Sequence, residues 1–149
     1  MLRTIIKEGE PTKNGRVYST GVMAKIKESL QPYIDKKICW VVLGSDRDVF
    51  ITACASDIQD LFTERAFGLY AGLVKGFFIE NGEGILDIEI LPTAVGDNLK
   101  TYLELGVDFR VDFDIKISLI EHTDDGLPLI TPENIIEVIP VVSLRKYEG

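Results

Sequence analysis

The chain has 149 residues, of which 46% are hydrophobic and 27% charged, and a formal net charge of -8. This composition is typical of one soluble globular domain, residues 1–149, and the acidic excess argues against sequence-independent binding to nucleic acid. No apolar run approaches the roughly 20 residues that cross a bilayer, and the N-terminus lacks the apolar segment of a signal peptide. We therefore expect no membrane partner, and a protein used in a cytosol or inside a particle assembled there.

The N-terminal part of the chain carries a strand pattern followed by a helix pattern. Leu2–Lys7 predicts a first strand, and the loop after it is dense in turn residues. Ser19 or Thr20 is suited to cap the helix that follows, and Pro32 predicts the end of that helix. Four apolar residues share one face of the helix at helical spacing: Val22, Met23, Ile26 and Leu30.

Strand patterns dominate the middle of the chain. Asn81 and Gly82 predict a tight hairpin that leads into a strand at Ile85–Leu91. Gly72 and Gly76 lie inside a strand pattern, which indicates a bulge or a tight bend rather than a phosphate-binding loop. The predicted strands before the hairpin are Cys39–Leu43, Val49–Ala55, Ile58–Glu64 and Leu69–Ile79.

A second helix and a last strand are predicted in the C-terminal part. Thr93 starts the helix, and turns are expected at Asp124–Gly126 and Thr131–Asn134. Ile135–Leu144 is predicted as the last strand, ending the sheet, and Pro140 within it indicates an edge position or a bulge. The helix has four apolar residues on one face: Val95, Leu99, Tyr102 and Leu103.

The clearest single element is a long strand at Val107–His122. Seven apolar residues, the last of them Leu119, alternate there with polar ones, which predicts one buried face and one exposed to water. Carboxylates in a row can bind a cation or perform acid–base chemistry, but the basic residues between them favour a solvated face of mixed charge. The polar residues are Asp108, Arg110, Asp112, Asp114, Lys116 and Ser118.

Two helices with seven or eight strands, most of them antiparallel, predict an α+β fold whose sheet is strongly bent or closed into a barrel. Cys39 and Cys54 lie in apolar stretches and are expected to be buried, reduced thiols. Four aromatic residues lie in or beside apolar runs, which favours core packing over an aromatic binding surface: Tyr33, Trp40, Phe50 and Phe62.

The sequence offers no recognisable catalytic, cofactor-binding or metal site. Its only histidine is His122, and Ser118 lies four residues away on the same strand face, roughly 13 Å distant at about 3.3 Å per residue. The two are therefore too far apart to form a nucleophile–base pair, and a surface histidine is expected. One histidine with two distant cysteines argues against zinc, and Asp124–Gly126 is a turn rather than a calcium loop.

Several stretches, taken in order, resemble the prohead core proteases of tailed phages. Lys13–Tyr18 resembles an Asn-Gly-Arg-(Ile/Val)-Tyr segment that leads into a helix in that family, and Ser56–Phe62 resembles its Ile-x-Asp-Leu-Trp strand. Leu105–Val107 then matches the start of a Leu-Gly-Val-Ser-Ser-Arg-Gly motif that carries the catalytic serine. The resemblance spans roughly residues 13–119 and implies a prohead-protease-like fold.

The departures from the family concern its catalytic residues. Asp108–Val111 stands where the family has Ser-Ser-Arg-Gly, so both serines are absent, and only Arg110 is retained. Gly44–Asp48 corresponds to the segment that supplies the family's catalytic histidine, and it contains none. Losing both nucleophile and base removes most of the rate enhancement of such a site. The resemblance therefore implies the fold without its chemistry.

The expected function is a non-catalytic structural protein of a tailed-phage head, located in the virion or in a prohead assembled in the host cytoplasm. Its expected partners are phage capsid or other head proteins, with self-association also possible and no cofactor required. Two alternatives stay open. One is an active maturation protease with Ser45, Ser56 or Cys54 as nucleophile and His122 as base. The other is an unrelated small acidic protein-binding module.

Overall fold

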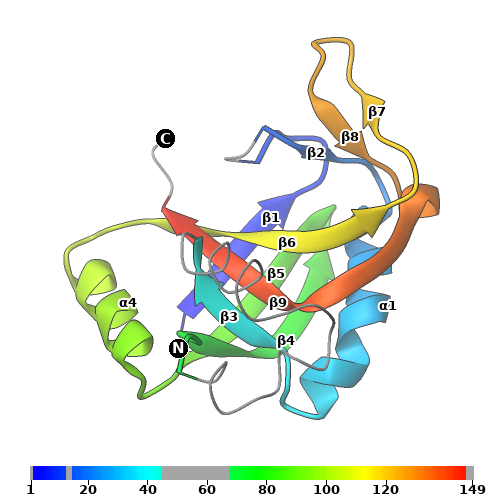
Figure 1. Cartoon of the computed structure of the whole chain (residues 1–149). Coiled ribbons are helices and arrows are strands. Elements are labelled where there is room, and N and C mark those ends of the chain that lie inside the picture. The colour runs from blue at the N-terminus through cyan, green and yellow to red at the C-terminus, as the bar shows by residue number, and fades with distance from the viewer. Residues whose placement is uncertain (1, 13–14, 45–67, 147–149) are drawn as a thin grey trace.

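The structure, a computed structural model, describes residues 2–12, 15–44 and 68–146. Its main feature is a curled six-stranded sheet with the strand order β1-β5-β4-β3-β9-β6 (Figure 1). Its strands are β1 (Leu2–Lys7), β3 (Trp40–Leu43), β4 (Gly72–Glu80), β5 (Glu83–Ile90), β6 (Phe109–Ile117) and β9 (Ile135–Lys146). A smaller sheet, ordered β2-β8-β7, lies at one end and contains β2 (Val17–Tyr18), β7 (Glu121–His122) and β8 (Pro128–Ile130).

The main sheet curls until its two edge strands meet. Neighbouring strands are antiparallel except for β3 and β9, which run parallel. The hydroxyl of Thr4 in β1 donates a hydrogen bond of 3.4 Å to the carbonyl oxygen of Phe109 in β6, the opposite edge. Together with the two α-helices found among the described residues, this half-barrel confirms the predicted α+β class and its bent, mainly antiparallel sheet.

The hairpin between β4 and β5 confirms the turn predicted from its sequence. Asn81 and Gly82 both have positive φ, 51° and 76°, as the central residues of a type I′ turn require. Gly76 lies at a bulge, because Lys75 is an extra residue between the pairs that join β4 to β5. Gly72 serves a different purpose. A Cβ there would lie 2.7 Å from the side chain of Ile88, so β4 and β5 can pair this closely only because residue 72 has no side chain.

Helix α1 (Val22–Asp35) begins without the predicted side-chain cap. Its N-cap is Gly21 in the left-handed conformation, and the carboxylate of Glu8 accepts hydrogen bonds from the backbone N–H groups of Gly21 and Met23, at 2.9 and 3.0 Å. The prediction of Ser19 or Thr20 as the cap was therefore wrong, because Glu8, in the loop between β1 and β2, satisfies these donors.

The prediction that Pro32 ends α1 was also wrong. The helix continues to Asp35, because the residues after Pro32 have packing partners: Ile34 is buried, and Tyr33 packs against the core. The proline removes one helical hydrogen bond, which the packing of this last turn offsets. Helix α4 (Ala94–Glu104) begins as predicted, with the Thr93 hydroxyl accepting a hydrogen bond of 2.9 Å from the Gly96 N–H.

The long strand predicted at Val107–His122 is divided between the two sheets. β6 ends at Ile117, and β7 belongs to the small sheet, so Leu119 is 60% exposed rather than buried. The strand predicted to end the sheet, β9, lies between β3 and β6 instead. Pro140 is accommodated by a bulge in β9. Val138 and Val142, four residues apart, pair with Ile115 and Phe113 of β6, which are only two residues apart.

The core confirms several of the predicted buried residues. Cys39 is buried and free, and Tyr33 packs against the main core. Trp40 belongs to a second apolar cluster, where its ring stacks on that of Tyr70 with centroids 4.9 Å apart. In the described part of the chain, no helix combines the length and apolar character needed to span a membrane. Several predictions lie outside the described residues: Val49–Ala55, Ile58–Glu64, Phe50, Phe62 and Cys54.

Candidate functional site

The structure does not pair the residues considered for nucleophilic catalysis. His122 is exposed on β7 of the small sheet, where it lies opposite Pro128. Ser118 lies just beyond β6, and both its N–H and its hydroxyl donate to the carbonyl oxygen of Asn134 rather than to His122. This agrees with the prediction of a surface histidine. The other candidate nucleophiles, Ser45, Ser56 and Cys54, and nearly all of the segment compared with the family's histidine, Gly44–Asp48, lie outside the described residues.

The segment that the sequence resemblance aligns with the family's serine motif, Asp108–Val111, leads into the start of β6. Asp108 is exposed, and its carboxylate accepts hydrogen bonds of 3.0 and 3.3 Å from Arg110. Phe109 is only 8% exposed, and its ring lies 6.2 Å from that of Tyr102 on helix α4. An ion-paired aspartate and a core aromatic ring thus occupy the two positions that the sequence resemblance aligns with the family's serines.

Asp112 is buried, which corrects its predicted place on a solvated face. It is 6% exposed, and its Oδ1 accepts hydrogen bonds from the hydroxyl of Tyr18, at 2.8 Å, and from the Arg16 guanidinium. Arg16 also donates to Tyr18 at 2.8 Å and to the carbonyl oxygen of Phe113 at 2.6 Å. Arg16 and Tyr18 cover this part of β6, so its outer face does not reach water there.

The surroundings of this cluster fix its protonation. Burial raises the pKa of the Tyr18 phenol far above its ordinary value, so the hydroxyl remains a donor to Asp112. Burial tends to lower the pKa of Arg16, but the neighbouring oxygens of Tyr18 and Asp112 have the larger opposite effect. The pKa of Arg16 is therefore raised. The result is a hydrogen-bonded cluster of a cation, a carboxylate and a neutral phenol, whose main effect is structural, although the Nε of Arg16 is buried without a hydrogen-bond partner.

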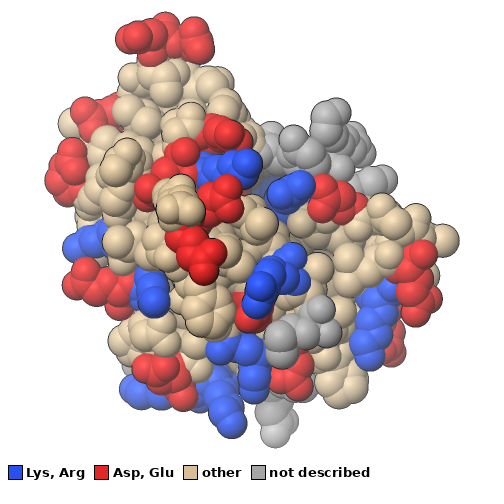
Figure 2. Space-filling view, turned by 180° about the vertical axis from the view of Figure 1, so that it is seen from behind, with Lys and Arg blue, Asp and Glu red and all other residues tan. Residues whose placement is uncertain are grey.

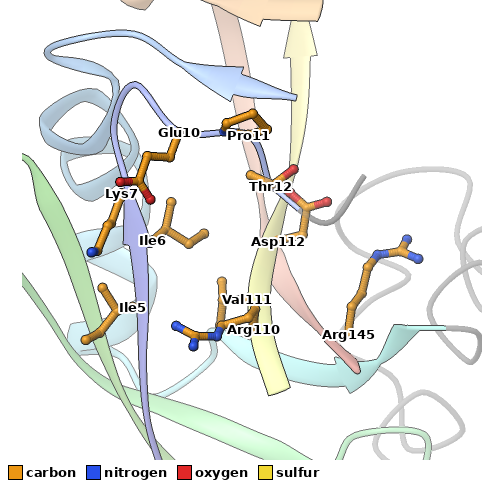
Figure 3. A pocket seen from close by; sticks show the side chains of 10 residues that line it. All are labelled: Ile5, Ile6, Lys7, Glu10, Pro11, Thr12, Arg110, Val111, Asp112 and Arg145. Atoms are coloured by element: carbon orange, nitrogen blue, oxygen red, sulfur yellow. The ribbon is translucent and has the colours of Figure 1, made fainter. Parts of the chain in front are cut away.

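A small cavity opens beside this cluster, in the gap between β1 and β6 (Figure 3). Its volume is about 230 Å³. The lining of the cavity contains charges of both signs. Its lining residues are Ile5, Ile6, Lys7, Glu10, Pro11, Thr12, Arg110, Val111, Asp112 and Arg145.

The acidic residues elsewhere do not form a metal site in the described ranges. No three residues among His, Cys, Asp and Glu there lie close enough together to hold an ion. Asp124 and Asp125 are exposed in the turn between β7 and β8, which Gly126 closes with a φ of 84° and a hydrogen bond to Thr123. The predicted turn is thus confirmed. Figure 2 shows acidic side chains at one projecting end of the rear face and both signs interspersed below it.

The chain shares its fold with a known viral protease. Neither a protein-family model nor a curated protein sequence matches it. Among solved structures, it resembles the bacteriophage T4 capsid assembly protease gp21, with a TM-score of 0.64 and 13% identity. The match covers 98% of this chain and 81% of the protease chain. At this identity the likeness shows the fold alone, and it confirms the prediction of a prohead-protease-like fold.

Raising the pH above about 9 is expected to destabilise the protein. Burial raises the pKa of the Cys39 thiol from 9.0 to about 12, so the folded chain keeps a proton that the unfolded chain releases. The free energy of unfolding should then fall by about 1.4 kcal/mol per pH unit between these two values, with Tyr18 adding to the slope above pH 10.0. Guanidinium unfolding of wild type and Cys39→Ala as a function of pH measures this; equal slopes would contradict it.

Proposed function

We propose that the chain is a non-catalytic structural protein of a tailed-phage head, built on a protease-like fold. In this proposal its partners are capsid or other head proteins and further copies of itself, in a virion or a prohead assembled in the host cytoplasm. It requires no cofactor, nucleic acid or membrane. The proposal is carried by Asp108 and Phe109, just before and at the start of β6, because the sequence resemblance aligns these two positions with the family's serines.

The packing of β6 supports a structural role. Phe109, Val111 and Phe113 are all buried, and each pairs with a residue of β9. A nucleophile must instead be exposed to substrate and lie within hydrogen-bond reach of a base. The T4 protein named in the fold comparison acts in capsid assembly, and the shared fold supports the same setting for this chain. That likeness extends over nearly the whole chain, which disfavours an unrelated binding module.

Quantitative mass spectrometry of purified proheads and mature particles tests the proposal. We expect the chain at a fixed copy number per head, either in mature particles as a permanent component or in proheads as a core component. Portal and major capsid protein in the same samples provide internal standards of copy number. Absence of the chain from both kinds of particle would contradict a structural role in the head.

An active protease is the second candidate, because the fold comparison is with an enzyme. In that case Ser45, Ser56 or Cys54 would act as nucleophile and His122 as base. We expect that a fluorophosphonate probe, which labels activated serines, does not modify the purified protein, and that capsid and scaffold proteins stay intact during incubation with it. Labelling or cleavage that is lost in Ser45→Ala, Ser56→Ala or Cys54→Ala, and also in His122→Ala, would establish the protease instead.

A further inference from the structure

We propose that the cavity between β1 and β6 binds the C-terminal residue of a partner polypeptide. The backbone of that residue would pair with the edge of β6 at Val111, and its carboxylate would pair with Arg110. The proposal rests on the geometry of the cavity rather than on the role proposed above, and it names a contact surface and the chemistry of its partner.

The edge of β6 that lies toward β1 carries backbone groups for pairing with a partner. Alternate residues of a strand direct their N–H and C=O groups to the same edge. The carbonyl oxygens of Phe109 and Phe113 point toward β1 and its loop, because they accept hydrogen bonds from Thr4 and Arg16. Val111 lies midway between them and lines the cavity, so its own N–H and C=O face the same gap. These groups are suited to pair with an added strand.

The gap beside Val111 limits the length of the segment that can pair there. The Thr4–Phe109 contact closes the gap on one side of Val111, and the contacts of Arg16 with Asp112 and Phe113 close it on the other. A strand running through would have to break both. The cavity of about 230 Å³ is also smaller than the roughly 300–1,000 Å³ of pockets for drug-sized ligands. The end of a chain fits these limits, whereas a continuous strand does not.

The positive charges in the lining of the cavity indicate the charge of the guest. Figure 3 shows the Arg110 guanidinium in the gap between Ile5 and Val111, whereas Arg145 extends to the other side of β6. A guanidinium fork matches a carboxylate in shape and charge. Lys7, also in the lining, is ion-paired with Glu83 at 3.7 Å, as Arg110 is with Asp108 at 3.0 Å, but its ammonium is a point charge without a fork. These positions favour Arg110 as the partner of a terminal carboxylate.

The remaining lining residues refine the identity of the ligand. The hydroxyl of Thr12 is buried without a hydrogen-bond partner and is suited to a polar backbone atom of the guest. Ile5 and Ile6 give the cavity an apolar wall, which favours an apolar C-terminal side chain. Glu10 also lines the cavity and opposes a second negative charge, which disfavours an acidic last residue.

Titration of the ¹⁵N-labelled full chain with an N-acetylated Ala-Ala-Val peptide, as free acid and as C-terminal amide, tests the proposal by NMR. We expect saturable shifts of the Val111 and Arg110 signals with the acid, with a Kd of order 1 mM, and about tenfold weaker binding of the amide. Equal binding of acid and amide, shifts confined to other surfaces, or no shifts would overturn it.

Three variants locate the carboxylate contact. Arg110→Gln should weaken binding of the acid about tenfold, to the level of the amide. Arg3→Gln is the matched control, because Arg3 is also exposed and paired with an aspartate, Asp87, at 2.8 Å; it should bind as wild type does. Asp108→Asn removes one competing partner of Arg110 and should strengthen binding. If Arg110→Gln and Arg3→Gln, both folded by their NMR spectra, bind equally, the proposal is wrong.

Discussion

Asp112→Ala is expected to lower the free energy of unfolding by about 3 kcal/mol, because it leaves the Arg16 charge without its carboxylate in a largely buried place. The side chains of Arg16 and Asp112 are 23% and 8% exposed, so water can compensate only part of the loss. The Tyr18 hydroxyl would also lose its acceptor. Guanidinium unfolding followed by circular dichroism measures the difference.

Two further variants distinguish the stability contributed by the buried Arg16–Asp112 pair from the general effect of removing an acidic side chain. Asp108→Ala is the matched control just before the same strand: its ion pair with Arg110 is exposed, and its removal should cost at most about 1 kcal/mol. Combining Asp112→Ala with Arg16→Met should cost less than the sum of the two single changes, because the unpaired charge is gone. A cost for Asp112→Ala no larger than for Asp108→Ala would show that the cluster contributes little to stability.

The elements that the sequence predicted well are those decided by neighbouring residues. The hairpin at Asn81 and Gly82 needs only two residues that tolerate positive φ, and the cap at Thr93 needs only a hydroxyl before a helix. The alternation that predicted β6 was equally local, and it located the strand correctly up to Ile117. It failed beyond that residue, because nothing in the pattern marks where a strand leaves one sheet and joins another.

The residues that sequence reasoning placed wrongly depend on contacts between distant segments. Asp112 is buried by Arg16, 96 positions away, and an alternating pattern carries no sign of that cover. Glu8 caps α1 from the loop between β1 and β2, a position that cap preferences do not consider. The cavity arises where β1 meets β6, at Thr4 and Phe109, 105 positions apart. It could be found only once the curl of the sheet was known, although Arg110 had already been singled out by the family resemblance.

Gly96→Ala is expected to destabilise the protein by about 3 kcal/mol, although alanine is the better helix former by about 1 kcal/mol. A Cβ at this position of α4 would lie 1.9 Å from the carbonyl oxygen of Leu91 and 3.2 Å from that of Ala71. Both obstacles are backbone, so no side-chain rotation relieves the overlap. The helix would have to move away from the sheet, and Leu99, now fully buried, would lose packing.

Asn98→Ala is the matched control for this prediction, because it adds an alanine to an exposed position of the same helix. It should leave stability unchanged or raise it by a few tenths of a kcal/mol, as helix propensity requires.

Gly106→Ala, just beyond the helix, tests backbone strain without overlap: its φ is +82°, and no atom lies within 4 Å of the added Cβ. Its cost should stay near 1 kcal/mol. Thermal and guanidinium unfolding of the three variants should rank Gly96→Ala as the least stable. If Gly96→Ala were as stable as Asn98→Ala, α4 would not be held against the sheet as closely as the structure shows.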